Sequence, residues 1–117
     1  MPTVEIFEIA EPTDLEAAHT IRQIVFCGEQ NVDPAEDFDG LDDQCRQYLA
    51  RRGTNAVGTA RLRDAGDGVI KIERVAVLME ERGNGFGKAL MDRTIKDARA
   101  TGARTIAINA QCHAEKF

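Results

Sequence analysis

The sequence predicts an α/β domain built around one mixed sheet, and three observations lead to this fold class. Turn residues at positions 53–55 and 66–68 separate three predicted strands, which is the pattern of two consecutive antiparallel hairpins. The third of these strands leads into a glycine-rich loop and a helix, and another strand follows the helix. A strand–helix–strand unit places its two strands parallel to each other. At 117 residues the chain is expected to form a single domain, residues 1–117, with one core.

The amino-terminal third is predicted to contain a strand, a helix and a loop. Val4 and Ile6 alternate with polar residues, which predicts a first strand. Thr13 and Glu16 have the spacing of a capping box, and a helix is expected from there to about Gly28. Residues 29–43 include a proline, a glycine and seven acidic residues, so this stretch is expected to form a loop or a broken short helix. The helical face is marked by Leu15, Ala18, Ile21, Ile24 and Val25.

The remaining elements follow from hydrophobic periodicity. Residues 45–52 and 56–63 alternate around the first turn. Residues 72–78 form an apolar, β-branched run that only Glu73 and Arg74 interrupt, which predicts a central strand nearly buried on both faces. A helix is predicted to begin near Phe86 and to end by Gly102, with a fifth strand at residues 104–110. One face of that helix is marked by Leu90, Met91, Thr94, Ile95 and Ala98.

The loop between the fourth strand and its helix has the composition of an anion site. Gly83, Gly85 and Gly87 alternate where the helical period begins, so successive backbone N–H groups can converge next to a positive helix end. Two common phosphate motifs do not fit. A P-loop would require other residues than Arg82 and Ala89, and a dinucleotide fingerprint would require its third glycine at position 88.

The motif that fits is Arg82-x-x-Gly85-x-Gly87 after the segment 75–77, which reads Val-Ala-Val. It resembles the coenzyme A pyrophosphate loop of the GNAT superfamily of N-acetyltransferases. Residues 24–26 and 29–32, with the acidic stretch 37–43, are similar to the amino-terminal signature of small bacterial acetyltransferases of the ElaA type. Residues 109–117 also resemble the fifth strand of that group and the loop after it. These three segments occur in this sequence in the same order as in the family.

The resemblance implies a GNAT-like acyl-CoA N-acyltransferase fold and acetyl-CoA as co-substrate. It implies that the two parallel strands splay apart, that pantetheine bonds to the backbone of the fourth strand, and that the pyrophosphate lies on the glycine loop. The acetyl group would pass to a primary amine by direct attack in a ternary complex. An alternative from another class is a catalytically weak or inactive module of GNAT fold that binds CoA or a protein partner. The implied cofactor-binding residues are Val75, Ala76, Val77, Arg82, Gly83, Asn84, Gly85, Phe86, Gly87, Lys88 and Asn109.

Two residues are candidates for acid–base chemistry, each with a structural alternative. Glu73 could accept the proton of the amine, or it could pair with Arg74 or Arg61. His113 has a suitable ordinary pKa, but a lone histidine is often a surface or structural residue. Asn109 could bind pantetheine or end a strand.

The cysteines support a structural interpretation. Cys112 lies beside His113, but adjacent residues of a strand point to opposite faces, so Cys27 and Cys112 are interpreted as small hydrophobic residues and not as nucleophiles. Three cysteines without C-x-x-C spacing predict neither a disulfide framework nor a zinc site.

The acidic residues 37–43 do not match a calcium loop, because Asp42 stands where glycine is required. No metal site is therefore predicted, and a reducing cytoplasm is the expected location.

The net charge of the chain and the position at which the sequence ends lead to further expectations about partners and fold. A net charge of −5 disfavours nonspecific binding to nucleic acid or acidic membranes, and the acidic stretch favours a cationic small-molecule or peptide amine. No leader or membrane-spanning run is expected. GNAT proteins continue past the fifth strand into a helix and two strands, with a tyrosine placed to protonate the leaving thiolate, whereas this sequence stops at Phe117. The fold is therefore expected to be truncated after strand five, with an edge that a second copy could cover in a homodimer.

Overall fold

The computed structural model describes residues 4–33 and 40–108, and in this part of the chain five strands form one sheet. The strands are arranged in chain order, the first four antiparallel to their neighbours and the fifth parallel to the fourth. The predicted α/β class with a mixed sheet is confirmed. The strands are β1 (Val4–Glu8), β2 (Cys45–Arg52), β3 (Asn55–Gly66), β4 (Val69–Val77) and β5 (Thr105–Ile108).

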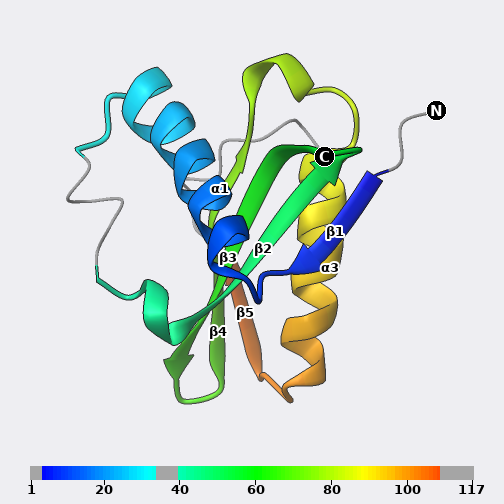
Figure 1. Ribbon diagram of the computed structural model, residues 1–117. Helices are drawn as coiled ribbons and strands as arrows, with labels where there is room; N and C mark the ends of the chain where they lie inside the picture. Colours follow the sequence, from blue (N-terminus) through cyan, green and yellow to red (C-terminus); the bar gives the residue numbers. More distant parts are fainter. Residues whose placement is uncertain (1–3, 34–39, 109–117) are drawn as a thin grey trace.

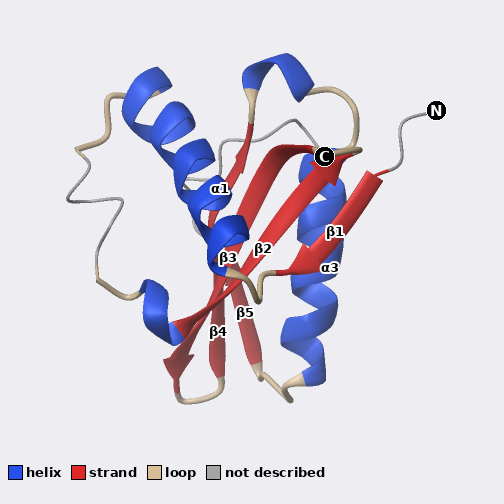
Figure 2. Ribbon diagram, in the orientation of Figure 1, coloured by secondary structure: helices blue, strands red, loops and turns tan. Residues whose placement is uncertain are grey.

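Two helices cover opposite faces of this sheet (Figure 1). One is α1 (Pro12–Arg22), which continues directly into a π-helix, η1 (Gln23–Glu29). The other is α3 (Phe86–Ala100). Figure 2 shows a short helical turn between β4 and α3, which is the 3₁₀ helix η3 (Met79–Glu81). A second 3₁₀ helix, η2 (Asp42–Gln44), precedes β2.

The core consists of two apolar clusters, one on each face of the sheet. Because successive strand residues point to opposite faces, β4 supplies both clusters: Val75 and Val77 pack on the α3 side and Ala76 on the α1 side. All three side chains have 0% of their surface exposed. The prediction that the fourth strand is buried on both faces is confirmed. Phe86 and Leu90 fix the first turns of α3 onto the same cluster as Val75.

The predicted capping box at the start of α1 is wrong. The helix begins at Pro12, its N-cap is Glu11, and no side chain caps it, so Thr13 and Glu16 already lie within the helix. Proline favours the first helical position because its fixed φ suits a helix and its missing N–H has no intrahelical acceptor there. The helical stretch does extend to about Gly28 as expected, but its last part is the π-helix η1.

Both predicted hairpins are present, and the second contains an irregularity that the sequence did not indicate. Thr59 pairs with Ala76 and Arg61 pairs with Glu73, so two β4 residues lie opposite one β3 residue. The extra residue forms a β-bulge at Arg74, whose φ of 55° is in the left-handed region. Bulges bend a strand and re-aim its side chains, and they are common next to binding sites. This bulge separates the β4 segment beside β5 from the segment that leads to the glycine loop.

The pairing of β4 with β5 extends from Val69 opposite Thr105 to Ile72 opposite Ile108. The parallel orientation is therefore confirmed. The predicted strand continued to Ala110, but Asn109 and Ala110 lie outside the described residues, so the expected splaying of the two strands stays a prediction. Within the described part of the chain, no helix is long and apolar enough to cross a membrane.

Candidate functional site

The glycine-rich loop lies where β4 and η3 lead into α3, and its geometry requires glycine. Gly83 has φ of 87° and Gly85, the N-cap of α3, has φ of 85°, a region that glycine adopts at little energetic cost. A Cβ added at either residue would have no other heavy atom within 4 Å, so both positions border open space. The positive end of the fifteen-residue helix α3 faces this loop. The arrangement suits a phosphate group placed next to the backbone.

Most other residues predicted to bind the cofactor here have side chains that are buried or that bond to a neighbour in the same segment. Phe86 is 1% exposed and packs in the core, so only its backbone can face a ligand. The Asn84 side chain donates to the Glu81 carbonyl at 3.2 Å, which stabilises the loop internally. Lys88 is exposed and pairs with Asp92 at 2.8 Å, one helical turn further along α3. The side chains of residues 75–77 are likewise buried, which leaves their backbone groups as the possible contacts.

Arg82 connects the glycine loop to two other elements. Its Nε donates to the Val77 carbonyl at 2.9 Å, and its two terminal nitrogens contact the Glu29 carboxylate at 3.0 and 3.2 Å. The guanidinium thus joins the end of β4 to the end of η1. Sequence reasoning assigned Arg82 to the cofactor and did not identify Glu29 as its partner. A bidentate contact of this kind holds the guanidinium in one orientation and so helps to fix the conformation of the loop.

We expect Glu29→Gln to loosen the glycine loop without unfolding the protein. The substitution removes the charge that pairs with Arg82, and a partly buried pair contributes on the order of 1 kcal/mol. Amide hydrogen exchange should become faster across residues 82–85. A suitable control is Glu5→Gln, which removes an exposed pair with Arg51 at the sheet edge and should leave exchange in the loop unchanged. Equal loop exchange in both variants would contradict a supporting role for Glu29.

Glu73 lies inside a group of arginines. It is 4% exposed, and its carboxylate accepts from Arg61 at 2.9 Å and from Arg63 at 2.8 and 3.2 Å. Burial would raise its pKa, but hydrogen bonds from Arg63 and Arg61 and their positive charges outweigh this and lower the pKa to about 2. The expected alternative of pairing with Arg61 is confirmed. A carboxylate with so low a pKa is a weak proton acceptor at neutral pH, so a catalytic role for Glu73 stays a prediction that this geometry does not favour.

The arginines continue into a network on the α1 face of the sheet. Asp42 accepts from Arg22 at 2.9 Å, from Arg61 at 3.0 Å and from the Gln47 side chain at 2.9 Å. Burial would raise the pKa of Asp42, but these hydrogen bonds lower it. Arg22 and Arg61 are both fully buried. We call the set Arg22, Asp42, Arg61, Arg63 and Glu73 the buried ion-pair network.

Sequence reasoning named only the Glu73–Arg61 pair of this network and missed the rest. It placed Asp42 in an acidic stretch that favours a cationic amine, whereas the structure places Asp42 against two buried arginines. A usable signal was present in β3, where Arg61 lies between the apolar residues Ala60 and Leu62 in a buried stretch of strand. Asn109, Cys112 and His113 lie outside the described residues, as do Asp37 and Asp39, and their predicted roles stay predictions.

Comparison with known proteins agrees with the geometry of β4, the glycine loop and α3. Residues 4–117 match the model of the acetyltransferase (GNAT) family. The chain belongs to the GNAT family of acetyltransferases. A relative from Bacillus subtilis, the uncharacterised N-acetyltransferase YjcF, is 36% identical over 103 residues, which cover 88% of this chain and 73% of the relative.

Solved GNAT structures share the fold described here. A Bacillus subtilis acetyltransferase in complex with CoA is 25% identical and superimposes with a TM-score of 0.71, covering 91% of this chain and 64% of that protein. A GNAT family acetyltransferase from Brucella melitensis in complex with acetyl-CoA is 19% identical, with a TM-score of 0.79 and coverage of 92% and 76%. The second likeness concerns the fold alone. These comparisons support an acyltransferase of GNAT fold and leave the acceptor open.

Proposed function

We propose that this GNAT protein transfers the acetyl group of acetyl-CoA to a primary amine of a small molecule or peptide. The single observation that carries the proposal is the pair of positive-φ glycines, Gly83 and Gly85, bordering open space at the start of α3. The printed descriptions of two structural neighbours, one with CoA and one with acetyl-CoA, support the choice of ligand.

In this proposal the pyrophosphate lies on the backbone of residues 82–88, and pantetheine follows β4 toward the bulge at Arg74. The amine then attacks the thioester carbonyl directly: a C–N bond forms, the C–S bond breaks, the nitrogen loses a proton and the thiolate gains one. No covalent enzyme intermediate is needed. Holding the two reactants together can lower the barrier by roughly 7–11 kcal/mol, so positioning by the loop and β4 carries most of the catalysis. Which group accepts the proton stays open, with Glu73 and His113 as the sequence-based candidates.

We expect Gly85→Ala to weaken acetyl-CoA binding about tenfold, measured by calorimetry, and to lower thiol release in the presence of an amine panel. The new Cβ would enter the open space where the pyrophosphate approaches, and alanine does not readily hold φ of 85°. The matched control is Gly102→Ala, because Gly102 has φ of 83° and equally open surroundings at the other end of α3. Equal affinities for Gly85→Ala and Gly102→Ala would remove the pyrophosphate assignment.

A second candidate function is a module of GNAT fold that binds CoA but transfers slowly. The observation that favours it is the low pKa of Glu73, which makes this predicted base a weak proton acceptor at neutral pH. The amine panel separates the two functions. Acetyl-CoA binding with amine-dependent thiol release supports the enzyme, whereas binding without release for any amine supports the module.

A further inference from the structure

The side of the sheet that faces α1 changes from apolar to charged along β4. The apolar cluster under α1 and η1 includes Ala76 of this strand. Ile70 and Ile72 pack in the cluster on the α3 side, so Lys71 and Glu73, which alternate with them, point to the α1 side. The amino-terminal half of β4 therefore presents charged side chains on the same face of the sheet that is apolar further along the strand.

Two cations lie side by side on this charged part of the face. Lys71 is directly opposite Arg63 of β3. Opposed residues of antiparallel strands have Cβ atoms about 4.5–5.5 Å apart on one face, and like charges in such a pair are destabilising. The Arg63 side chain is 22% exposed and Lys71 is half-buried, so both can be reached from solvent. On the β5 side Lys71 pairs with Ala107, whose side chain is a single methyl group.

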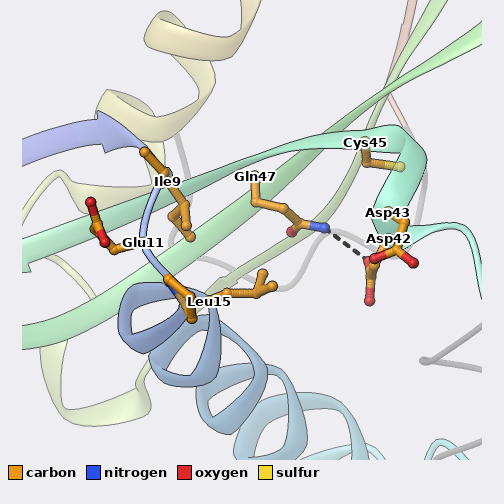
Figure 3. A pocket seen from close by; sticks show the side chains of 9 residues that line it. Ile9, Glu11, Leu15, Asp42, Asp43, Cys45 and Gln47 are labelled. Carbon is orange, nitrogen blue, oxygen red and sulfur yellow. Dashed lines mark hydrogen bonds between the residues drawn. The ribbon is translucent and has the colours of Figure 1, made fainter.

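The described residues compensate only part of this positive charge. Glu73 accepts from Nε and Nη2 of Arg63, which occupies one edge of the guanidinium. Within the described chain, neither Arg63 Nη1 nor the Lys71 ammonium has a hydrogen-bond partner. Asp42 accepts from Gln47 at a pocket that neither Arg63 nor Lys71 lines (Figure 3). The buried ion-pair network has three arginines and two carboxylates, so with Lys71 it has two positive charges in excess, in a chain of net charge −5.

A carboxylate matches the donors that remain. The Nη1–Nη2 edge of a guanidinium can donate two parallel hydrogen bonds to a carboxylate, and an adjacent ammonium can donate to the same oxygens. An anion placed there would also relieve the repulsion between Lys71 and Arg63. A cationic ligand would bring only donors to this surface and would add to the excess of positive charge.

The two cations lie within reach of the place proposed for acetyl transfer. Pantetheine is proposed to follow β4 toward the bulge at Arg74, and Lys71 precedes that bulge by three residues, which is about 10 Å along a strand. On the α3 side, the apolar cluster that contains Ile72 and Val75 closes the sheet. We therefore expect a polar amine to approach the thioester across the α1 side. An anionic group several bonds away from its nitrogen would then meet Arg63 and Lys71.

We propose that Arg63 and Lys71 bind a carboxylate of the acceptor, and that the acceptors of this protein are amines that carry a carboxylate at the far end of a short chain. The carboxylate accepts from the Nη1–Nη2 edge of Arg63 and from the Lys71 ammonium. This inference rests on the proposed acetyl transfer and narrows its substrate class. It differs from the expectation of a purely cationic acceptor, which came from the acidic stretch 37–43.

The first test compares three amines with the same six-carbon chain and different far ends. They are 6-aminohexanoate, hexylamine and 1,6-diaminohexane, and the readout is thiol release from acetyl-CoA by the full chain. We expect kcat/KM for 6-aminohexanoate to be about tenfold higher than for hexylamine, and 1,6-diaminohexane to be the poorest acceptor. Added salt should reduce the differences, because the two cations are partly exposed.

Variants at Lys71 assign the preference to this side chain. Lys71→Met should bring 6-aminohexanoate close to hexylamine, and Lys71→Glu should make 1,6-diaminohexane a better acceptor than 6-aminohexanoate. Lys71→Met is expected to be at least as stable as the parent in urea, since it removes the repulsion with Arg63. The matched control is Lys96→Met, because Lys96 is exposed on α3, which covers the other face of the sheet. It should keep the preference of the parent.

An NMR titration without acetyl-CoA separates this inference from the proposed function. Hexanoate is the probe, and the Ala107 methyl and the Arg63 Nε–H are the reporters. We expect saturable shifts with the parent and none with Lys71→Glu, and hexylammonium should give none with either. If hexanoate binds but no amine releases thiol, acetyl transfer is refuted while the carboxylate site stands. If amines are acetylated without preference for 6-aminohexanoate, or hexanoate does not bind, the assignment of Arg63 and Lys71 is wrong and acetyl transfer is unaffected.

Discussion

Replacing Arg61 with methionine is expected to lower the free energy of unfolding by about 3–5 kcal/mol, the largest effect on stability that we predict. Arg61 is fully buried and donates to both Asp42 and Glu73. Methionine fills much of the same volume but leaves the buried carboxylate of Glu73 and the partly buried carboxylate of Asp42 short of their counter-charge. The substitution is severe because it leaves negative charge without a partner inside the protein, and not because the ion pairs themselves contribute much stability. Urea denaturation at neutral pH measures the difference directly.

The control is Arg51→Met, which removes an arginine from an ion pair at the exposed edge of the sheet. Arg51 contacts Glu5 at 3.1 Å, with 34% and 56% of the two side chains exposed, and its guanidinium lies 4.9 Å from the Phe7 ring centroid. Such a contact contributes only about 1 kcal/mol. If Arg61→Met destabilised the protein no more than Arg51→Met does, the buried ion-pair network would have no special importance for folding.

The second large effect is a loss of stability in acid that depends on Glu73. Its pKa in the folded protein is about 2, below the ordinary value of 4.5. Because the folded-state pKa is depressed, the stabilisation is complete above about pH 4.5 and is lost as the pH falls toward 2. The shift corresponds to about 3 kcal/mol, and Asp42, whose pKa is also lowered, acts in the same direction.

Denaturation midpoints between pH 5 and pH 2.5 test this dependence. We expect Glu73→Gln to be less stable at neutral pH, since Arg61 and Arg63 lose a negative partner, and to show a shallower decline in acid because one titrating group is gone. Glu80→Gln is the matched control, since Glu80 is exposed in η3. The role assigned to Glu73 would be wrong if the decline in acid were as steep in Glu73→Gln as in Glu80→Gln.

The elements that could be predicted from sequence are those encoded by local patterns. The two hairpins follow from turn residues with alternating neighbours, and the buried fourth strand follows from a run of β-branched residues. The glycine loop could be predicted because Gly83 and Gly85 need conformations that few other residues adopt, and both have positive φ in the structure. The start of α1 was misplaced by two residues because a capping-box pattern at Thr13 competed with a proline at the first helical position.

The features that could not be predicted depend on contacts between distant segments. Glu29 and Arg82 are 53 positions apart, and Arg22 reaches Asp42 only because α1 and η2 meet over the same face of the sheet. The bulge at Arg74 is a matter of strand register, which no short pattern in β4 reveals. The buried Oε1 of Gln47, which has no hydrogen-bond partner among the described residues, could not be predicted either, because its surroundings depend on how the β1–α1 connection packs over β2. Tertiary packing, and not local propensity, sets each of these.

The chain-order arrangement of the strands has a consequence for the folding pathway. Strands β2, β3 and β4 are joined by two-residue turns, so their pairing closes only short loops and can form early. Strand β1 can join β2 only after the long segment between Glu8 and Cys45, including α1 and η1, has been brought back to the sheet. The higher contact order of that step makes β1 a late addition to a central meander that is already paired. The same closure brings the β1–α1 connection over β2, so the pocket lined by Ile9, Leu15 and Gln47 is completed at a late stage, after the strand that leads to the glycine loop is in place.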